Sequence, residues 1–171
     1  MDITKLEQKN KCAFAIKLAE KASSYLQESN VKDLINEAIE VSWKWVHTEE
    51  NLGEVLYNFL DNEENGFTLF QEMEEDEKNI NAWDCIIDAI AYISRVAYEK
   101  EGVKYLPEPI EIVSDNVFTH MVHSLILCDS IEREYIEKVY QKCLETIKIT
   151  KGGCMQWMQR QGNSRIFSHI W

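Results

Sequence analysis

Apolar residues recur at helical spacing along most of the chain, and this pattern predicts an all-α protein. In residues 4–28, for example, Phe14, Leu18 and Ala22 fall on one side of a helix. Only two prolines and six glycines occur in 171 residues, and both prolines lie within residues 102–109, so helix breakers are scarce. We therefore expect an all-α, single-domain bundle of about six helices.

The expected helices are apolar stripes separated by capping or turn residues. They span residues 4–28, 31–47, 48–60, 81–100 and 114–127, and a sixth that follows a cap at Asp129 or Ser130 and reaches Ile149. The second and fourth carry apolar residues on nearly every side, so we expect them to be central. The helical domain should occupy residues 1–150, followed by a tail of unknown role, residues 151–171, which contains no acidic residue.

Charge is distributed unevenly along the chain. The net charge is -12, and residues 45–77 contain eleven carboxylates but no lysine or arginine. Two of them, Glu49 and Glu50, fit the first turn of a helix that Thr48 caps. A surface of one sign speeds association with an oppositely charged partner at the cost of self-repulsion, so the stretch indicates a basic partner. A solvated acidic loop is the structural alternative.

The most informative part of this stretch is residues 61–79, where the helical pattern weakens and a loop or short helix is expected. Aromatic residues lie among its acids, a mixture that a purely solubilising loop does not require. The partner-binding residues predicted here are Asp61, Glu63, Glu64, Phe67, Phe70, Glu72, Glu74, Glu75, Asp76 and Glu77. The three tryptophans Trp43, Trp45 and Trp83 are assigned to the core instead.

The sequence lacks the motifs of common active sites. There is no phosphate-binding loop, nucleophile elbow, H-E-x-x-H motif or dinucleotide fingerprint. His120 and His123 are three residues apart, but the Glu-x-x-His pairs of a di-iron bundle are missing, so we interpret them as structural or surface residues. Asp84 and Asp88 share a helix face that we interpret as solvated and salt-bridged. We expect no enzyme activity, no metal and no cofactor.

Other features limit where the protein acts and what it binds. No apolar run is long enough to span a membrane and the first residues lack a secretory signal, so we expect a cytoplasmic protein without a membrane partner. Uncompensated acids would repel phosphate, which disfavours nucleic-acid binding. The five cysteines are widely spaced, which favours buried small side chains over disulfides or a zinc site.

Four segments carry a resemblance to a known family. They are CAFAIKLAEKASSYL at 12–26, LINEAIEVSWKWV at 34–46, NAWDCIIDAIAYISRVAYEKEG at 81–102 and LPEPIEIV at 106–113. Together they resemble the all-helical immunity-six proteins of bacterial polymorphic toxin systems, over about residues 10–148. The resemblance implies a small protein that binds and neutralises one cognate toxin, usually encoded by a neighbouring gene, with no activity of its own. It transfers no binding residue, because the family offers no interface motif to match.

We therefore expect an immunity protein in which residues 48–77 help to dock a basic toxin domain, for example a nuclease, and occlude it. Carboxylates would pair with lysines and arginines of the toxin, while Phe67 and Phe70 would supply apolar anchors. Two alternatives remain at this point. One is a non-enzymatic helical regulatory or scaffold protein of another partner, and the other is an enzyme that uses acidic residues of the central helices.

Overall fold

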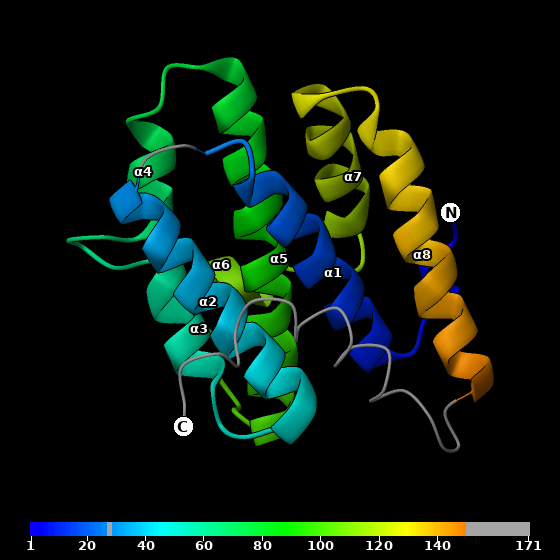
Figure 1. Ribbon diagram of the computed structural model, residues 1–171. Coiled ribbons are helices and arrows are strands. Elements are labelled where there is room, and N and C mark those ends of the chain that lie inside the picture. Colours follow the sequence, from blue (N-terminus) through cyan, green and yellow to red (C-terminus); the bar gives the residue numbers. More distant parts are fainter. Residues whose placement is uncertain (27–28, 150–171) are drawn as a thin grey trace, which may run out of the picture.

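The computed structural model describes residues 1–26 and 29–149, and for residues 29–30 and 146–149 it describes the backbone alone. This part of the chain folds into eight α-helices and a short 3-10 helix, without a β-strand (Figure 1). The all-α class predicted from periodicity is confirmed. The elements are η1 (Ile3–Lys5), α1 (Gln8–Ser23), α2 (Ser29–Thr48), α3 (Gly53–Leu60), α4 (Phe67–Glu72), α5 (Glu77–Glu101), α6 (Glu108–Glu111), α7 (Val117–Cys128) and α8 (Glu132–Ile149).

Helix α5 is central, as predicted for residues 81–100. It packs mainly against α1, α3 and α7 and also contacts α2, α4 and α6. Figure 1 shows α5 in the middle of the molecule, with α2, α3 and α4 on one side and α7 and α8 on the other. Its start is fixed by the side chain of Asp76, and its end by Gly102, which adopts φ 74 at the position after the last helical residue.

The other central helix is α1 rather than α2, which corrects the prediction. Helix α1 contacts α2, α5, α7 and α8, and side chains such as Phe14 are fully buried. Helix α2 packs mainly on α1 and leaves Glu37 and Glu40 exposed to solvent. Its Trp43, assigned to the core from the sequence, is only partly buried, and its indole N–H donates a hydrogen bond to Glu20 (2.7 Å). One covered side is therefore enough for α2.

Two helix boundaries differ from the prediction for local reasons. Helix α1 ends at Ser23, where the hydroxyls of Ser23 and Ser24 donate to the preceding carbonyls of Glu20 (2.8 Å) and Lys21 (2.7 Å). Thr48 does not cap α3 but ends α2, and α3 begins only at Gly53. The short helices α4 and α6, which periodicity alone does not separate from loops, account for the count of eight instead of six.

The core between these helices contains Trp45 and Trp83, both 2% exposed, as predicted. The four described cysteines are buried, which confirms their interpretation as small core residues; they are Cys12, Cys85, Cys128 and Cys143. In the described part of the chain no helix is both long enough and apolar enough to cross a membrane. The tail of unknown role, residues 151–171, lies outside the described residues.

Candidate functional site

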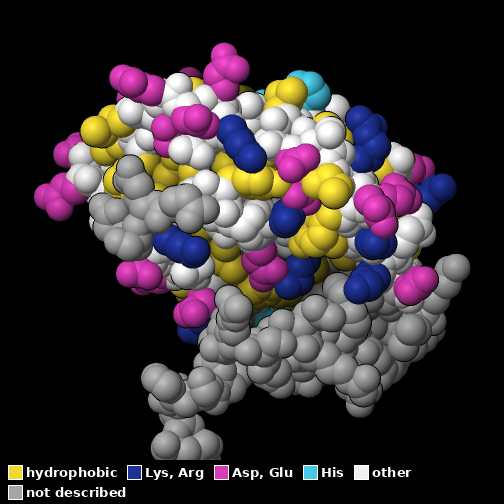
Figure 2. Space-filling view, turned by 45° about the horizontal axis from the view of Figure 1, so that its top comes forward, with side chains coloured by type: hydrophobic (Ala, Val, Ile, Leu, Met, Phe, Trp, Pro, Cys, Tyr) yellow, Lys and Arg dark blue, Asp and Glu magenta, His cyan; other side chains and the backbone are white. Residues whose placement is uncertain are grey.

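The predicted site residues all lie between the end of α3 and the first residue of α5, a stretch that we call the acidic segment (residues 61–77). The segment consists of a loop, helix α4 and a short link that leads into α5 (Figure 1). Figure 2 shows acidic side chains concentrated on the left and upper left of the face in view, the side on which α3 and α4 lie in Figure 1. Most lysine and arginine side chains of this face lie to the right.

The loop of the acidic segment is held by hydrogen bonds to Asn62 and by a close approach of the backbone at Gly66. The side-chain oxygen of Asn62 accepts hydrogen bonds from the N–H groups of Glu64 (2.9 Å) and Asn65 (3.2 Å), and the N–H of Gly66 donates to the carbonyl of Asn62 (2.9 Å). A Cβ atom at Gly66 would lie 2.6–2.8 Å from backbone atoms of Asn62 and Leu60, which is too close for any side chain. These contacts tie the loop to the end of α3.

Helix α4 is attached to the core by its aromatic residues. Phe67 is fully buried, with ring centroids 6.1 Å from Phe59 and 5.4 Å from Trp83. Phe70 is partly buried and stacks on Trp83, with ring centroids 5.9 Å apart and an interplanar angle of 9°. These contacts position the acids around them. The structure places Phe67 beneath the surface, where a partner reaches it only if α4 moves.

Two acids of the link have a local structural role that sequence reasoning missed. The Glu74 carboxylate accepts hydrogen bonds from the N–H groups of Glu75 (3.0 Å) and Asp76 (3.1 Å). Asp76 is the N-cap of α5 and accepts from the N–H groups of Lys78 (2.9 Å) and Asn79 (3.0 Å). An N-cap aspartate also interacts favourably with the positive end of the helix dipole. These bonds fix the entry of the link into α5.

The carboxylates of the acidic segment have no counter-charge among the residues that the structure describes. Seven of the eight are exposed and Glu74 is partly exposed. Within the described residues none of them forms an ion pair with a lysine, arginine or histidine. Asp61 accepts a hydrogen bond from the hydroxyl of Tyr57, which helps to raise the pKa of Tyr57 to about 12. The eight acids are Asp61, Glu63, Glu64, Glu72, Glu74, Glu75, Asp76 and Glu77.

The two acids nearest the start of the acidic stretch behave differently. Glu49 bridges Lys9 (2.9 Å) and Lys100 (3.0 Å), and Glu50 pairs with Lys44 (2.8 Å). Hydrogen bonds from Lys9 and Lys100 lower the pKa of the Glu49 carboxyl below its ordinary value. The prediction that both residues occupy the first turn of a helix is wrong, because α3 begins later. They join elements of the fold instead.

One exposed apolar residue of the acidic segment was not predicted. Met73, between two glutamates, is 80% exposed. No periodic signal marks it, because a helix of six residues is too short to show which face is buried. An exposed thioether side chain adapts readily to a partner surface. Met73 is therefore the large apolar side chain that this segment offers to solvent.

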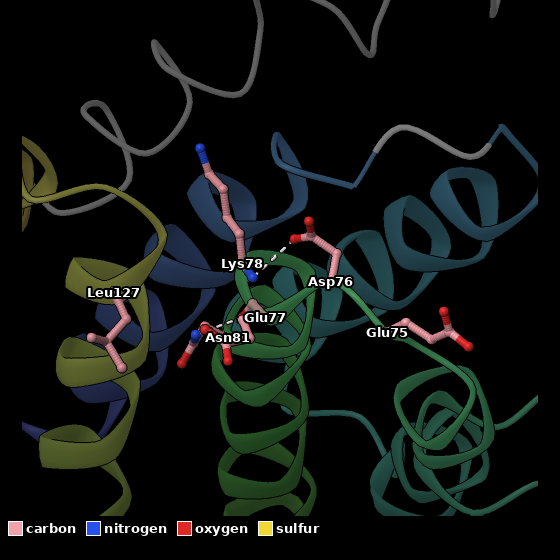
Figure 3. Close-up of a pocket in the computed structure, with 6 residues that line it drawn as sticks. All are labelled: Glu75, Asp76, Glu77, Lys78, Asn81 and Leu127. Carbon is pink, nitrogen blue, oxygen red and sulfur yellow. Dashed lines mark hydrogen bonds between the residues drawn. The ribbon is translucent and has the colours of Figure 1, made fainter.

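A hollow of about 570 Å³ lies at the end of the segment, where α5 begins. Figure 3 shows Leu127, from α7, opposite Glu77 and Asn81 of α5, while Glu75 points to the other side of the link. The ammonium group of Lys78 lies 4.5 Å above the ring of Tyr25 and so has a partner of its own. The hollow combines carboxylates with one exposed leucine and can accept a basic side chain with an aliphatic stem.

The structure places the other candidate residues in a polar surface network. His120 contacts the Asp88 carboxylate (2.6 Å), and Asp84 accepts a hydrogen bond from Gln71 (2.6 Å). His120 and His123 are both exposed, which confirms them as surface residues. Nowhere among the described residues do three or more His, Cys, Asp or Glu side chains form a group that could hold a metal ion.

Comparisons with known proteins bear on the role of this site. The family model described as Immunity protein Imm6 matches residues 10–128, from α1 to the end of α7, and this range contains the whole acidic segment. Neither the search of curated proteins nor that of solved structures returned a match. An immunity family implies a protein that acts against a toxin and is generally not an enzyme. Because the match covers more than half of the chain, the protein belongs to the Imm6 family of immunity proteins.

Proposed function

We propose that the protein neutralises its cognate toxin by covering a basic surface of that toxin with the acidic segment. Family membership supplies the toxin as partner. The observation that supports the acidic segment as the contact is that none of its eight carboxylates is paired within the described structure, whereas Glu49 and Glu50 in the same stretch are. Unpaired charges of one sign repel each other, and a basic partner relieves this repulsion.

The fixed backbone of the segment favours tight binding. The Asn62 side chain, Gly66 and the aromatic contacts of α4 hold the loop and helix before any partner arrives. A preformed surface loses less conformational entropy on binding than a mobile loop does. The acids are therefore presented at defined positions and can select among basic surfaces, not only attract them.

Charge alone rarely gives high affinity, so an apolar contact is also required. The prediction that Phe67 and Phe70 supply it stays a prediction, and their packing under α4 favours a supporting role. We assign the direct contact to Met73, with Leu127 at the edge of the neighbouring hollow. Both side chains lie beside carboxylates, an arrangement that fits lysine or arginine side chains with their long aliphatic stems.

A toxin domain that binds nucleic acid fits this surface well, because its substrate cleft must be basic. The mechanism would be occlusion: the acidic segment occupies the surface that the phosphates of the substrate would otherwise contact. This assignment gives the protein no nucleic-acid ligand and no membrane partner of its own. We also propose that the protein acts in the cytoplasm, where a toxin directed at nucleic acid would meet it.

The test is a charge reversal at three acids that form no side-chain hydrogen bond or ion pair within the described residues, Glu63, Glu72 and Glu75, each changed to Lys. The control reverses three exposed acids of α8, on the other side of the molecule in Figure 1: Glu134, which pairs with Lys138 (2.7 Å), Glu137, which accepts a hydrogen bond from Gln141 (2.7 Å), and Glu145. Both variants change the net charge by the same amount. Affinity is measured by calorimetry against the toxin domain encoded by the neighbouring gene.

We expect the first variant to lose affinity by about 100-fold and to show a weaker salt dependence, because close charge pairs dominate its contact. The control should lose less than about threefold, since only long-range attraction changes. In cells, the first variant should fail to rescue growth against the toxin while the control rescues it. Equal losses in the two variants would mean that net charge, and not the acidic segment, determines binding.

A further inference from the structure

A separate apolar groove lies beside the acidic segment, between α3, α5, α6 and the start of α7. Its volume is about 360 Å³, near the lower end of the range of about 300–1,000 Å³ found for binding pockets. Most of its lining is apolar, including Ile87 and Ala91 of α5 and Ile112 after α6. Two acids, Asp61 and Asp88, complete the wall. The groove has room for one bulky side chain.

The walls of the groove are held in place by the fold. Arg95 of α5 donates hydrogen bonds to the carbonyls of Ile110 (3.3 Å) and Glu111, which fixes the end of α6. The Ile110 side chain is buried, so the wall is also packed from behind. On the opposite side, the hydroxyl of Thr68 donates to the carbonyl of Leu60 (3.0 Å). A groove fixed in this way exists before a partner binds.

The mouth of the groove exposes an aliphatic side chain that the fold leaves in solvent. Ile112 is 82% exposed although it belongs to the lining. A single exposed isoleucine on a flat surface is unremarkable, but one that borders an apolar hollow extends an apolar patch. Such a patch is typical of an interaction surface.

The charges around the groove select the partner. No lysine or arginine is among the described residues that line it, whereas two carboxylates are. Asp88 has a side chain only 21% exposed, and burial raises the pKa of its carboxyl although His120 contacts it. Asp61 is also the first residue of the acidic segment, so the groove and the segment form one continuous surface. A cation beside an apolar group matches this combination.

We propose that the groove receives a large apolar side chain of the toxin, carried on a segment with a lysine or arginine next to it. The apolar side chain packs against Ile112 and Ala91, and the basic group pairs with Asp61 or Asp88. This inference rests on the proposed function and adds to it a second apolar contact beside Met73. All lining residues fall within the range that matches the family, unlike those of α8.

The test replaces Ile112 by Asp and compares it with Ile131→Asp. Ile131 is a matched control, because it is 69% exposed and lies outside both the groove and the acidic segment. Both isoleucines are exposed, so both variants should keep the melting temperature of the wild type. The probe is the toxin domain encoded by the neighbouring gene, and affinity is measured by calorimetry at low and high salt.

We expect Ile112→Asp to weaken binding by about tenfold or more, while Ile131→Asp changes it less than about twofold. The result is diagnostic because an added negative charge should by itself improve attraction to a basic toxin. The conservative variant Ile112→Met should bind like the wild type. Equal affinity of Ile112→Asp and Ile131→Asp would overturn the groove as the anchor.

Failure of this inference is distinguishable from failure of the proposed function. If Ile112→Asp binds normally while the Glu63, Glu72 and Glu75 reversal does not, the groove is overturned and the acidic segment stands. If the reversal also binds normally, the proposed function fails. Sedimentation of the free protein tests whether a second copy of the chain fills the groove instead. If the wild type is a dimer and Ile112→Asp is a monomer, a second copy occupies the groove and the proposal is overturned.

Discussion

Two groups of acids in one uninterrupted acidic stretch have opposite environments. Glu49 and Glu50 are paired with lysines from three different parts of the chain, and Glu49 joins the start of α1 to the end of α5. The eight carboxylates of the acidic segment, a dozen residues later, have no cationic partner within the described structure. The first group links elements of the fold through ion pairs; in the second, Glu74 and Asp76 accept local backbone hydrogen bonds, but none of the eight negative charges is neutralised by a described lysine, arginine or histidine.

The difference shows that the sign and density of charge along a sequence do not define a binding surface. What defines it is whether the fold brings counter-charges to the acids. Lys9 and Lys100 are far from Glu49 in sequence but within 3.0 Å of it in the structure. The acidic segment is held instead by Gly66, by the side chain of Asn62 and by aromatic packing, and within the described residues its carboxylates form no ion pair.

The largest effect on stability is expected from removing the aromatic support of the acidic segment. Phe67→Ala should lower the free energy of unfolding by about 3–5 kcal/mol, because the ring is fully buried between Phe59 and Trp83. The measurement is denaturant unfolding followed by tryptophan fluorescence. Phe70→Ala is the control and should cost less, since that ring is partly exposed. Equal, small losses would show that charges, and not packing, hold the segment.

The sequence predicts some of these features and not others, for physical reasons. Helix α5 is predictable because its apolar pattern is long and ends at Gly102. Helix α4 is not, since six residues hold too little periodicity. The role of Glu49 depends on Lys9 and Lys100, and such distant pairs leave no local signal.

The candidate site was predictable in its acids and not in its apolar parts. The sequence predicts the aromatic residues of the segment at the surface, but Phe67 packs against Trp83 of α5 and is buried. The exposure of Met73 and Ile112 depends on which face of a short helix meets the core. The groove beside Ile112 arises from four helices that are distant in sequence, so only the structure could show it.

An intermediate effect is expected from breaking the paired group. Glu49→Gln should lower the free energy of unfolding by about 1 kcal/mol near neutral pH, the sum of two partly exposed ion pairs. Because the lysines lower the pKa of Glu49 in the folded state, its contribution is present above the ordinary value of 4.5 and is lost as the pH falls through the folded value. Unfolding at several pH values should therefore show the difference between wild type and variant disappear in acid.

The control for this variant is Glu54→Gln, in the same acidic stretch but exposed and without an ion pair in the described structure. It should change stability little at any pH. A similar loss in both variants would contradict the role of Glu49 as a link between α1 and α5.

The smallest effect is expected at the unpaired acids. Glu72→Gln and Glu75→Gln together should change the free energy of unfolding by less than about 0.5 kcal/mol, since these exposed side chains have no intramolecular ion pair among the described residues. The change should be stabilising, because two mutually repelling charges are removed, and it should shrink at high salt, which screens that repulsion. Thermal unfolding at low and high salt measures both. A clear destabilisation that becomes smaller at high salt would mean that these carboxylates have attractive partners within the protein. The acidic segment would then stabilise the fold as Glu49 and Glu50 do, and its charges would no longer indicate a binding surface.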